Sequence, residues 1–203
     1  MIEKITTGSF FTNSYIISND YKECIIVDPG LSYRNAYEQI IAKYKPKAIL
    51  ITHGHVDHID GISFFKDLPV YISSMDEKMM YDSTNSLYLM INKITPFKNG
   101  ELNVINVSDG DIISLIGFSF RVISTPGHTK GSLCYLMDNN LFCGDTLFHL
   151  SSGRCDFPTG NSKEMNDSLK KLKVMISDDT MIYPGHDDIT RMDVEKKYNP
   201  YLQ

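Results

Sequence analysis

The chain of 203 residues has few cysteines and no long apolar run. Its four cysteines are too few and too scattered for a disulfide framework in a chain of this length: Cys24, Cys134, Cys143 and Cys155. No apolar segment is long enough to cross a bilayer. The first residues also lack the basic start and apolar run that are typical of a secretory signal. We therefore expect a cytoplasmic protein with no membrane partner, and we assign none of the cysteines to chemistry.

Positive charge is also scarce, with four arginines and a net charge of -5. Because nucleic-acid binding needs a clustered basic face, this balance argues against a nucleic-acid partner. The sequence contains no Pro/Gly/Ser linker, low-complexity tract or internal repeat. A chain that is 42% hydrophobic can bury a core and still form a cleft for a small-molecule substrate. We predict a single domain over residues 1–203 and leave its oligomeric state open.

Patterns of apolar residues predict strands and helices in both halves of the chain. Apolar residues at i, i+3, i+4 and i+7 predict one helix, namely Tyr37, Ile40, Ile41 and Tyr44. Asn161, followed three positions later by Glu164, predicts the start of another. Apolar or alternating runs predict strands at 2–6, 14–18, 24–27, 48–51, 118–122, 133–136 and 141–143. This order favours an α/β protein in which sheets pack together with helices outside.

Residues 74–95 have helical character without a clean apolar stripe. Their two apolar clusters, 79–81 and 88–90, are assigned to the core or, as the alternative, to the wall of a cleft.

The segment after the strand at 48–51 carries four metal-binding side chains within six residues. They are His53, His55, Asp57 and His58. Alternate residues of an extended turn can point the same way, and the next two come round as the chain bends into a helix. Imidazole and carboxylate groups suit zinc, iron or manganese, and no cysteine in the segment favours a thiolate site. The spacing therefore predicts a metal site at the end of a buried strand.

Three later segments each join an apolar strand, a glycine turn and one residue of a metal-binding type. They end at His128, Asp145 and His186. Side chains at strand ends converge on one edge of a sheet, where loops build binding sites. Asp145 taken alone is equally consistent with a helix cap or a turn. His149 is the only histidine outside the pattern, and we assign it to a structural or surface position.

An HxHxDH motif followed by separate His, Asp and His residues resembles the metallo-β-lactamase superfamily. Within that superfamily the sequence is similar to short glyoxalase II (hydroxyacylglutathione hydrolase)-like hydrolases. The similarity extends over segments 13–15, 27–30, 125–132, 144–148, 152–158 and 195–202. The resemblance implies an α/β fold, specifically the four-layered αβ/βα sandwich of the superfamily.

The resemblance also implies a ligand set for two divalent metal ions, with zinc expected first and iron or manganese as alternatives. His53, His55 and His128 would hold one ion, and Asp57, His58 and His186 the second. Asp145 would bridge both, which makes Asp57 and Asp145 the carboxylates of the catalytic centre. The implied reaction is attack of a metal-bridging hydroxide on a thioester such as a hydroxyacyl-thiol.

Three further residues have two interpretations each. Asp28 would orient a ligand imidazole or the HxHxDH turn, or it belongs to an ordinary Asp-Pro-Gly turn. Arg154 would contact an acidic substrate group or pair with Asp156, and the pairing is favoured. Lys130 would contact an anion or is an ordinary exposed lysine.

Other branches of the superfamily remain as alternatives. A mononuclear iron persulfide dioxygenase retains nearly the same ligand residues, and a lactonase fits the ligands alone. A β-lactamase is disfavoured because its familiar subclass places a cysteine at the second metal. Longer glyoxalase II enzymes carry a C-terminal helical extension that contacts glutathione, and this sequence ends before one. We therefore expect weak glutathione binding or a different thiol carrier.

Overall fold

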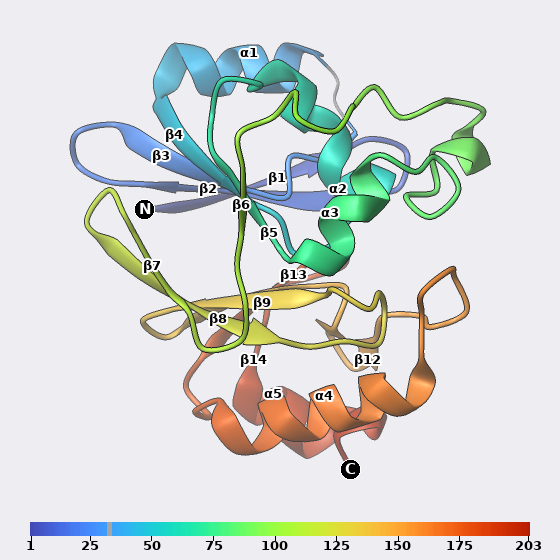
Figure 1. The fold of residues 1–203 in the computed structure, drawn as a ribbon. Coiled ribbons are helices and arrows are strands. Elements are labelled where there is room, and N and C mark those ends of the chain that lie inside the picture. Colours follow the sequence, from blue (N-terminus) through green and yellow to red (C-terminus); the bar gives the residue numbers. More distant parts are fainter. Residues whose placement is uncertain (32–33) are drawn as a thin grey trace.

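The computed structural model describes residues 1–31 and 34–203. Two six-stranded sheets lie face to face, and helices cover the outer face of each (Figure 1). The predicted four-layered αβ/βα arrangement is confirmed.

The first sheet has its strands in sequence order, β1 to β6. The strands β1 to β3 are antiparallel, and β3 to β6 are parallel. The strand bounds are β1 Ile2–Thr7, β2 Thr12–Ser18, β3 Glu23–Val27, β4 Lys45–Leu50, β5 Val70–Ile72 and β6 Val104–Asn106. The helical segments of this half are α1 Arg34–Lys43, α2 Val56–Ile59, η1 Asp60–Phe64, α3 Ser74–Met80 and η2 Tyr88–Ile91.

The second sheet has the order β14-β13-β10-β9-β8-β7, in which only β10 and β13 are paired in parallel. Its strands are β7 Ile112–Leu115, β8 Phe118–Ser124, β9 Leu133–Met137, β10 Asn140–Gly144, β13 Met181–Pro184 and β14 Thr190–Arg191. A small hairpin joins β11 Leu147–Phe148 to β12 Ser151–Ser152. The helical segments are α4 Ser162–Met175, α5 Met192–Tyr198 and η3 Pro200–Leu202.

The core is layered because side chains alternate between the faces of each strand. In β3, Ile25 and Val27 pack between the two sheets, whereas Cys24 and Ile26 pack on the opposite face, with α1 residues such as Tyr37. A third apolar cluster lies between the second sheet and its helices. Both sheets are thus covered on both faces, which leaves the strand ends as the place for a site.

The helix α4 begins where the sequence predicts, because Asn161 Oδ1 accepts hydrogen bonds from the backbone N–H groups of Lys163 and Glu164 at 2.9 and 3.2 Å. The prediction for α1 is less accurate. Tyr37 and Ile40 are buried as expected, but Ile41 is 51% exposed.

The prediction of helix over residues 74–95 is wrong beyond Met80. The carboxylate of Asp82 accepts hydrogen bonds from the backbone N–H groups of Thr84 and Asn85, at 2.8 and 3.1 Å, and these bonds replace helical ones. Leu87 then adopts a left-handed conformation with a φ of 66°. Of the two apolar clusters, 79–81 belongs to the core side, with Met80 fully buried. The cluster 88–90 is divided, since Tyr88 is in the core and Met90 lines a cleft.

No helix in the described part of the chain has both the length and the apolar character that a membrane crossing requires.

Candidate metal centre

All seven predicted ligand side chains meet at one place, where strands of both sheets end. His53 and His55 follow β4, and Asp57 and His58 lie on α2. The other three follow strands of the second sheet: His128 after β8, Asp145 after β10 and His186 after β13. A backbone hydrogen bond of 2.8 Å from Leu133 N–H to Thr52 C=O joins the two halves beside this cluster.

Glycine permits the close approach of the loops that carry these ligands. Gly144 has a φ of 49°, and a Cβ atom there would lie 2.2 Å from Thr52 Oγ1. A Cβ atom at Gly185 would lie 2.2 Å from Asp145 Oδ1. A larger residue at either position would therefore push two ligand-bearing loops apart.

Within the cluster, ligand atoms fall into groups that match the two predicted triads. One ligand atom from each of His53, His55 and His128 lies within 4.8 Å of the other two. The same holds for Asp57, His58 and His186, and for a third group of His53, His58 and Asp145 that spans both triads.

The carboxylate of Asp145 lies between the triads. Its Oδ2 is 3.4 Å from His128 Nε2 and 3.5 Å from His186 Nε2. Its Oδ1 is 3.4 Å from His58 Nε2. One carboxylate therefore faces members of both groups.

The donor atoms of this cluster fit metal ions. The Nε2 atoms of His53, His55 and His58 and the Oδ1 of Asp145 are buried and have no hydrogen-bond partner among the described residues. An unpaired buried polar atom is costly and rare, and coordination to a metal removes that cost.

The second nitrogen of several rings is held from behind, as is usual for metal-binding histidines. A hydroxyl, a carboxylate or a backbone carbonyl lies within hydrogen-bond distance of the Nδ1 atom of four rings. The pairs are His53 with Thr52 Oγ1 at 3.2 Å, His58 with Asp28 Oδ2 at 2.9 Å, His128 with Arg154 O at 2.6 Å and His186 with Phe10 O at 3.1 Å.

Asp28 lies behind the HxHxDH segment and is only 2% exposed. Besides its contact with His58, its carboxylate accepts hydrogen bonds from Thr52 N–H at 2.7 Å and from Thr52 Oγ1 at 2.6 Å. It also has a left-handed φ of 48°, which aspartate tolerates better than most residues do.

Electrostatics differ across the cluster. Burial holds the pKa of His53 well below its ordinary value and lowers the pKa of His55 to about 3, so both rings are neutral, as a metal ligand must be. Burial also opposes charging of His58, but the carboxylates of Asp57, Asp145 and Asp28 raise its pKa well above the ordinary value. The same negative field attracts a divalent cation.

The structure does not bring every predicted residue to the cluster. Arg154 lines the cleft, but its guanidinium makes two hydrogen bonds of 2.6 Å with Asp156 and lies 4.1 Å from the centre of the Phe157 ring. Lys130 is exposed and does not line the cleft. His149 lies outside the cluster, with its Nδ1 3.1 Å from Glu195 Oε1.

Two residues outside the predicted set, Thr12 and Asp76, contact the ligand segments. Thr12 Oγ1 donates a hydrogen bond of 2.9 Å to Asp57 Oδ2. The buried carboxylate of Asp76 accepts hydrogen bonds from Gly54 N–H at 2.9 Å and from Thr129 Oγ1 at 2.6 Å, so it ties the turn of the first motif to the loop of His128. Neither lies near a ligand motif that could have marked it.

Comparison with known proteins agrees with this site. The model of the metallo-β-lactamase superfamily matches residues 7–186. The hydroxyacylglutathione hydrolase GloC of Haemophilus influenzae is 28% identical over 99% of this chain and 97% of its own. The crystal structure of the B3 metallo-β-lactamase BLEG-1 has a TM-score of 0.92 and 28% identity, with all of both chains covered. That of TTHA1623 in a di-iron-bound form has a TM-score of 0.85 and 28% identity, covering 98% of this chain and 100% of that one.

The fold and the His/Asp cluster together define a metal-dependent hydrolase. The chain belongs to the metallo-β-lactamase superfamily.

Proposed function

We propose that the protein is a dinuclear metallohydrolase that cleaves thioesters, such as a hydroxyacyl-thiol. The observation that carries this proposal is the pair of ligand triads with the Asp145 carboxylate between them. The similarity to a hydroxyacylglutathione hydrolase and to a di-iron protein supports it. We further propose zinc as the first metal to test, with iron and manganese as alternatives, because imidazole and carboxylate ligands suit all three.

The chain's own residues would prepare the reaction by holding the centre in one geometry. The imidazole rings of His53, His55 and His128 would hold one ion, and Asp57, His58 and His186 the other. Asp145 would contact both and offset part of their mutual repulsion. Two divalent ions, when bound, would polarise the carbonyl of the substrate and lower the pKa of a bound water from about 15.7 towards 7.

Carboxylate positioning is the second contribution of the chain. Thr12 fixes one oxygen of Asp57 by a hydrogen bond of 2.9 Å. Asp28 would fix the His58 ring and, through Thr52, the start of the ligand segment. Both contacts keep ligands in place before a substrate arrives, which is where preorganisation contributes to catalysis.

A thioester suits this cleft because its leaving group needs no proton. A thiol has a pKa of about 8.5, so a thiolate departs readily near neutral pH. Among the described residues that line the cleft there is no lysine, tyrosine or cysteine to protonate a poorer leaving group.

A substrate panel tests this proposal. The metal-loaded protein should hydrolyse S-lactoylglutathione or simpler acyl thioesters, as measured by release of free thiol. Lactones, β-lactams and glutathione persulfide complete the panel. Turnover of lactones with every thioester inert would show that the substrate class is wrong.

Hydrolysis of β-lactams is a second candidate, favoured by the similarity to BLEG-1 over the whole chain. The absence of a cysteine among the seven ligand residues disfavours only the β-lactamase subclass that uses one, and BLEG-1 is a B3 enzyme. Loss of a β-lactam chromophore at rates above those of the thioesters would favour this candidate.

A further inference from the structure

The ligand cluster forms the floor of a cavity of about 430 Å³ whose walls are mainly apolar. His55, Asp57, His128, Asp145 and His186 lie at the floor. The apolar wall residues come from four separate segments of the chain and are Phe10, Val56, Leu87, Met90, Phe148 and Phe157. Ligand cavities of this size usually combine apolar walls with a few polar groups that fix orientation.

Two of the wall residues are exposed to solvent, and they come from two separate segments of the chain. Phe10 lies in the loop between β1 and β2 and is 43% exposed, and Met90 lies in η2 and is 61% exposed. Their sequence neighbours Phe11 and Leu89 are also exposed. Exposed apolar side chains at the rim of a cavity are typical of ligand-binding grooves, and Phe10 and Met90 both line this one.

Charge in the walls is nearly absent. Outside the cluster on the floor, Arg154 is the only charged residue among the described residues that line the cavity. Its guanidinium donates two hydrogen bonds to Asp156 and lies against the Phe157 ring. The positive charge of Arg154 is therefore already balanced by the Asp156 carboxylate. Glutathione carries two carboxylates and an ammonium group, and the described residues of these walls present no free cation for the carboxylates.

We infer that the cleft selects thioesters that present an uncharged apolar group to its walls, in either the acyl or the thiol part. This inference rests on the proposed thioesterase function and names its substrate class. The floor would take the thioester carbonyl, and the walls around Met90 and Phe10 would cover the apolar group. Selectivity should then grow with the apolar area removed from water.

Two substrate series test the inference and separate the acyl part from the thiol part. The first varies the acyl group from acetyl to octanoyl on the uncharged thiol N-acetylcysteamine. The second keeps acetyl and replaces N-acetylcysteamine by longer alkanethiols or by glutathione. We expect kcat/KM to rise by up to roughly 4-fold per added methylene in at least one series. A flat response in both series, or a preference for S-lactoylglutathione over every apolar thioester, would overturn the inference and leave thioester hydrolysis intact.

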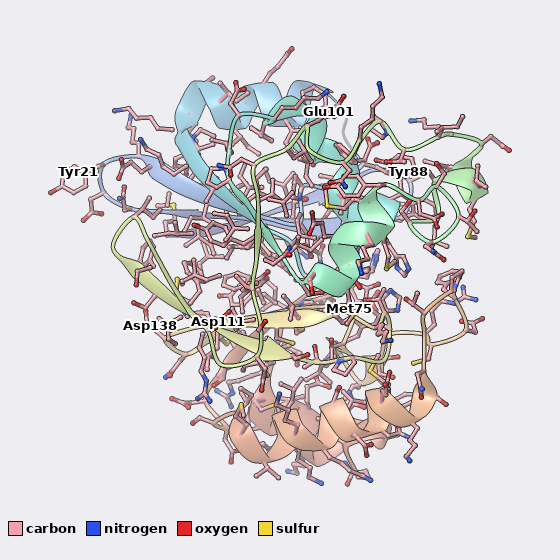
Figure 2. The ribbon with its side chains drawn as sticks, in the orientation of Figure 1. Tyr21, Met75, Tyr88, Glu101, Asp111 and Asp138 are labelled. Carbon is pink, nitrogen blue, oxygen red and sulfur yellow. The ribbon has the colours of Figure 1, made fainter. Side chains whose placement is uncertain are left out.

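A matched pair of variants tests the wall itself. Met90→Ser removes a wall side chain, and Met75→Ser makes the same change at a half-exposed position on α3 that does not line the cavity (Figure 2). Met90→Ser should lower kcat/KM for the best long-chain substrate by roughly 3- to 10-fold and leave that for the acetyl substrate unchanged. Met75→Ser should change neither value. Equal loss for both chain lengths in Met90→Ser would contradict a role for this wall in selectivity.

A binding measurement keeps this inference separate from the proposed reaction. Octanoate and acetate present the same carboxylate to the metal-loaded protein and differ only in apolar length. Calorimetric titration should show octanoate binding at least about 10-fold more tightly, and Met90→Ser should narrow that ratio. If no thioester is hydrolysed but this ratio holds, the reaction is misassigned and the apolar selectivity stands. Equal affinities would refute the selectivity whatever the reaction.

Discussion

The two ligand triads differ in charge and in access to solvent. His53, His55 and His128 are all imidazoles, each 1–2% exposed. The other triad contains the Asp57 carboxylate, and the side chain of His186 is 20% exposed. Burial keeps the pKa of His55 at about 3, whereas Asp145 and Asp57, against the opposing effect of burial, raise that of His186 to about 10.

This difference suggests distinct tasks for the two metal sites that we propose. The buried, all-imidazole triad of His53, His55 and His128 would hold its ion by coordination alone and lose it slowly. We call the triad of Asp57, His58 and His186 the open triad because His186 is partly exposed. It would bind its ion through coordination and negative charge, and a proton would compete for the His186 ring. Asp145 is the residue that the two proposed sites would share. We therefore expect a change at Asp145 to affect both sites, and a change at a ligand of one triad to affect mainly the site of that triad.

The largest effect is expected at Asp145. Asparagine keeps the size of the side chain but loses its charge, so Asp145→Asn should weaken both metals together. Activity should fall by more than the roughly 10²- to 10³-fold that removal of one stabilising group costs in other enzymes. Metal content and thiol release measure the two effects. Asp138→Asn, in the exposed turn between β9 and β10 (Figure 2), is the matched control. Two ions bound near wild-type affinity in Asp145→Asn, with turnover, would rule out the bridge.

Single histidine changes should separate the triads. His186→Ala should empty mainly the open site and leave close to one equivalent of metal, because the buried triad is intact. His128→Ala should weaken the buried site and lower activity as well. His149→Ala, outside the cluster, should keep both ions. Elemental analysis of the three variants gives the answer, and equal metal loss in His128→Ala and His186→Ala would mean that the sites do not fill independently.

A smaller effect is expected at Asp28, which contacts His58 and Thr52 but does not line the cavity. Asp28→Asn should cost about 10- to 100-fold in metal affinity or activity, as changes behind a metal ligand usually do. The loss should fall mainly on the site of His58. Asp20→Asn, at an exposed position, makes the same chemical change as a control. If Asp28→Asn leaves the affinity of the open site unchanged, Asp28 belongs to an ordinary turn.

The smallest effect is expected at the cysteines, none of which lies in the cluster. Cys24, Cys134 and Cys143 are buried, and burial raises the pKa of Cys134 to about 11 and that of Cys24 to about 12, so their thiols are inert. Replacing all four cysteines by alanine should leave the metal content intact and cost about 1 kcal/mol of stability at each buried site. Abrupt metal loss on changing Cys143 alone would show that the ligand set is mistaken.

Much of the fold could be predicted because it depends on patterns among residues that are close in sequence. Strand alternation and the Asn161 cap are local features, and the glycine turns mark where ligand residues leave their strands. Residues 74–95 could not be predicted in this way. Their helix ends because the Asp82 side chain competes for backbone N–H groups, and apolar composition does not record that competition.

The candidate site divides similarly. The ligand types stand in recognisable motifs, so their convergence was predictable. The contact of Thr12 with Asp57 spans 45 residues, and that of Asp76 with Thr129 spans 53, so only the folded chain reveals them. The paired state of Arg154 depends on a neighbour two residues away, Asp156, and the sequence favoured it for that reason.

The most direct test of the account is a metal titration of the metal-free protein, with thioester hydrolysis measured at each step. We predict saturation at two equivalents of zinc, iron or manganese, and full activity only when both are bound. The buried triad should fill first and leave most of the activity to the second equivalent. Saturation at one equivalent of iron, with oxygen consumed on addition of glutathione persulfide and no thioester cleaved, would contradict the account and indicate a dioxygenase.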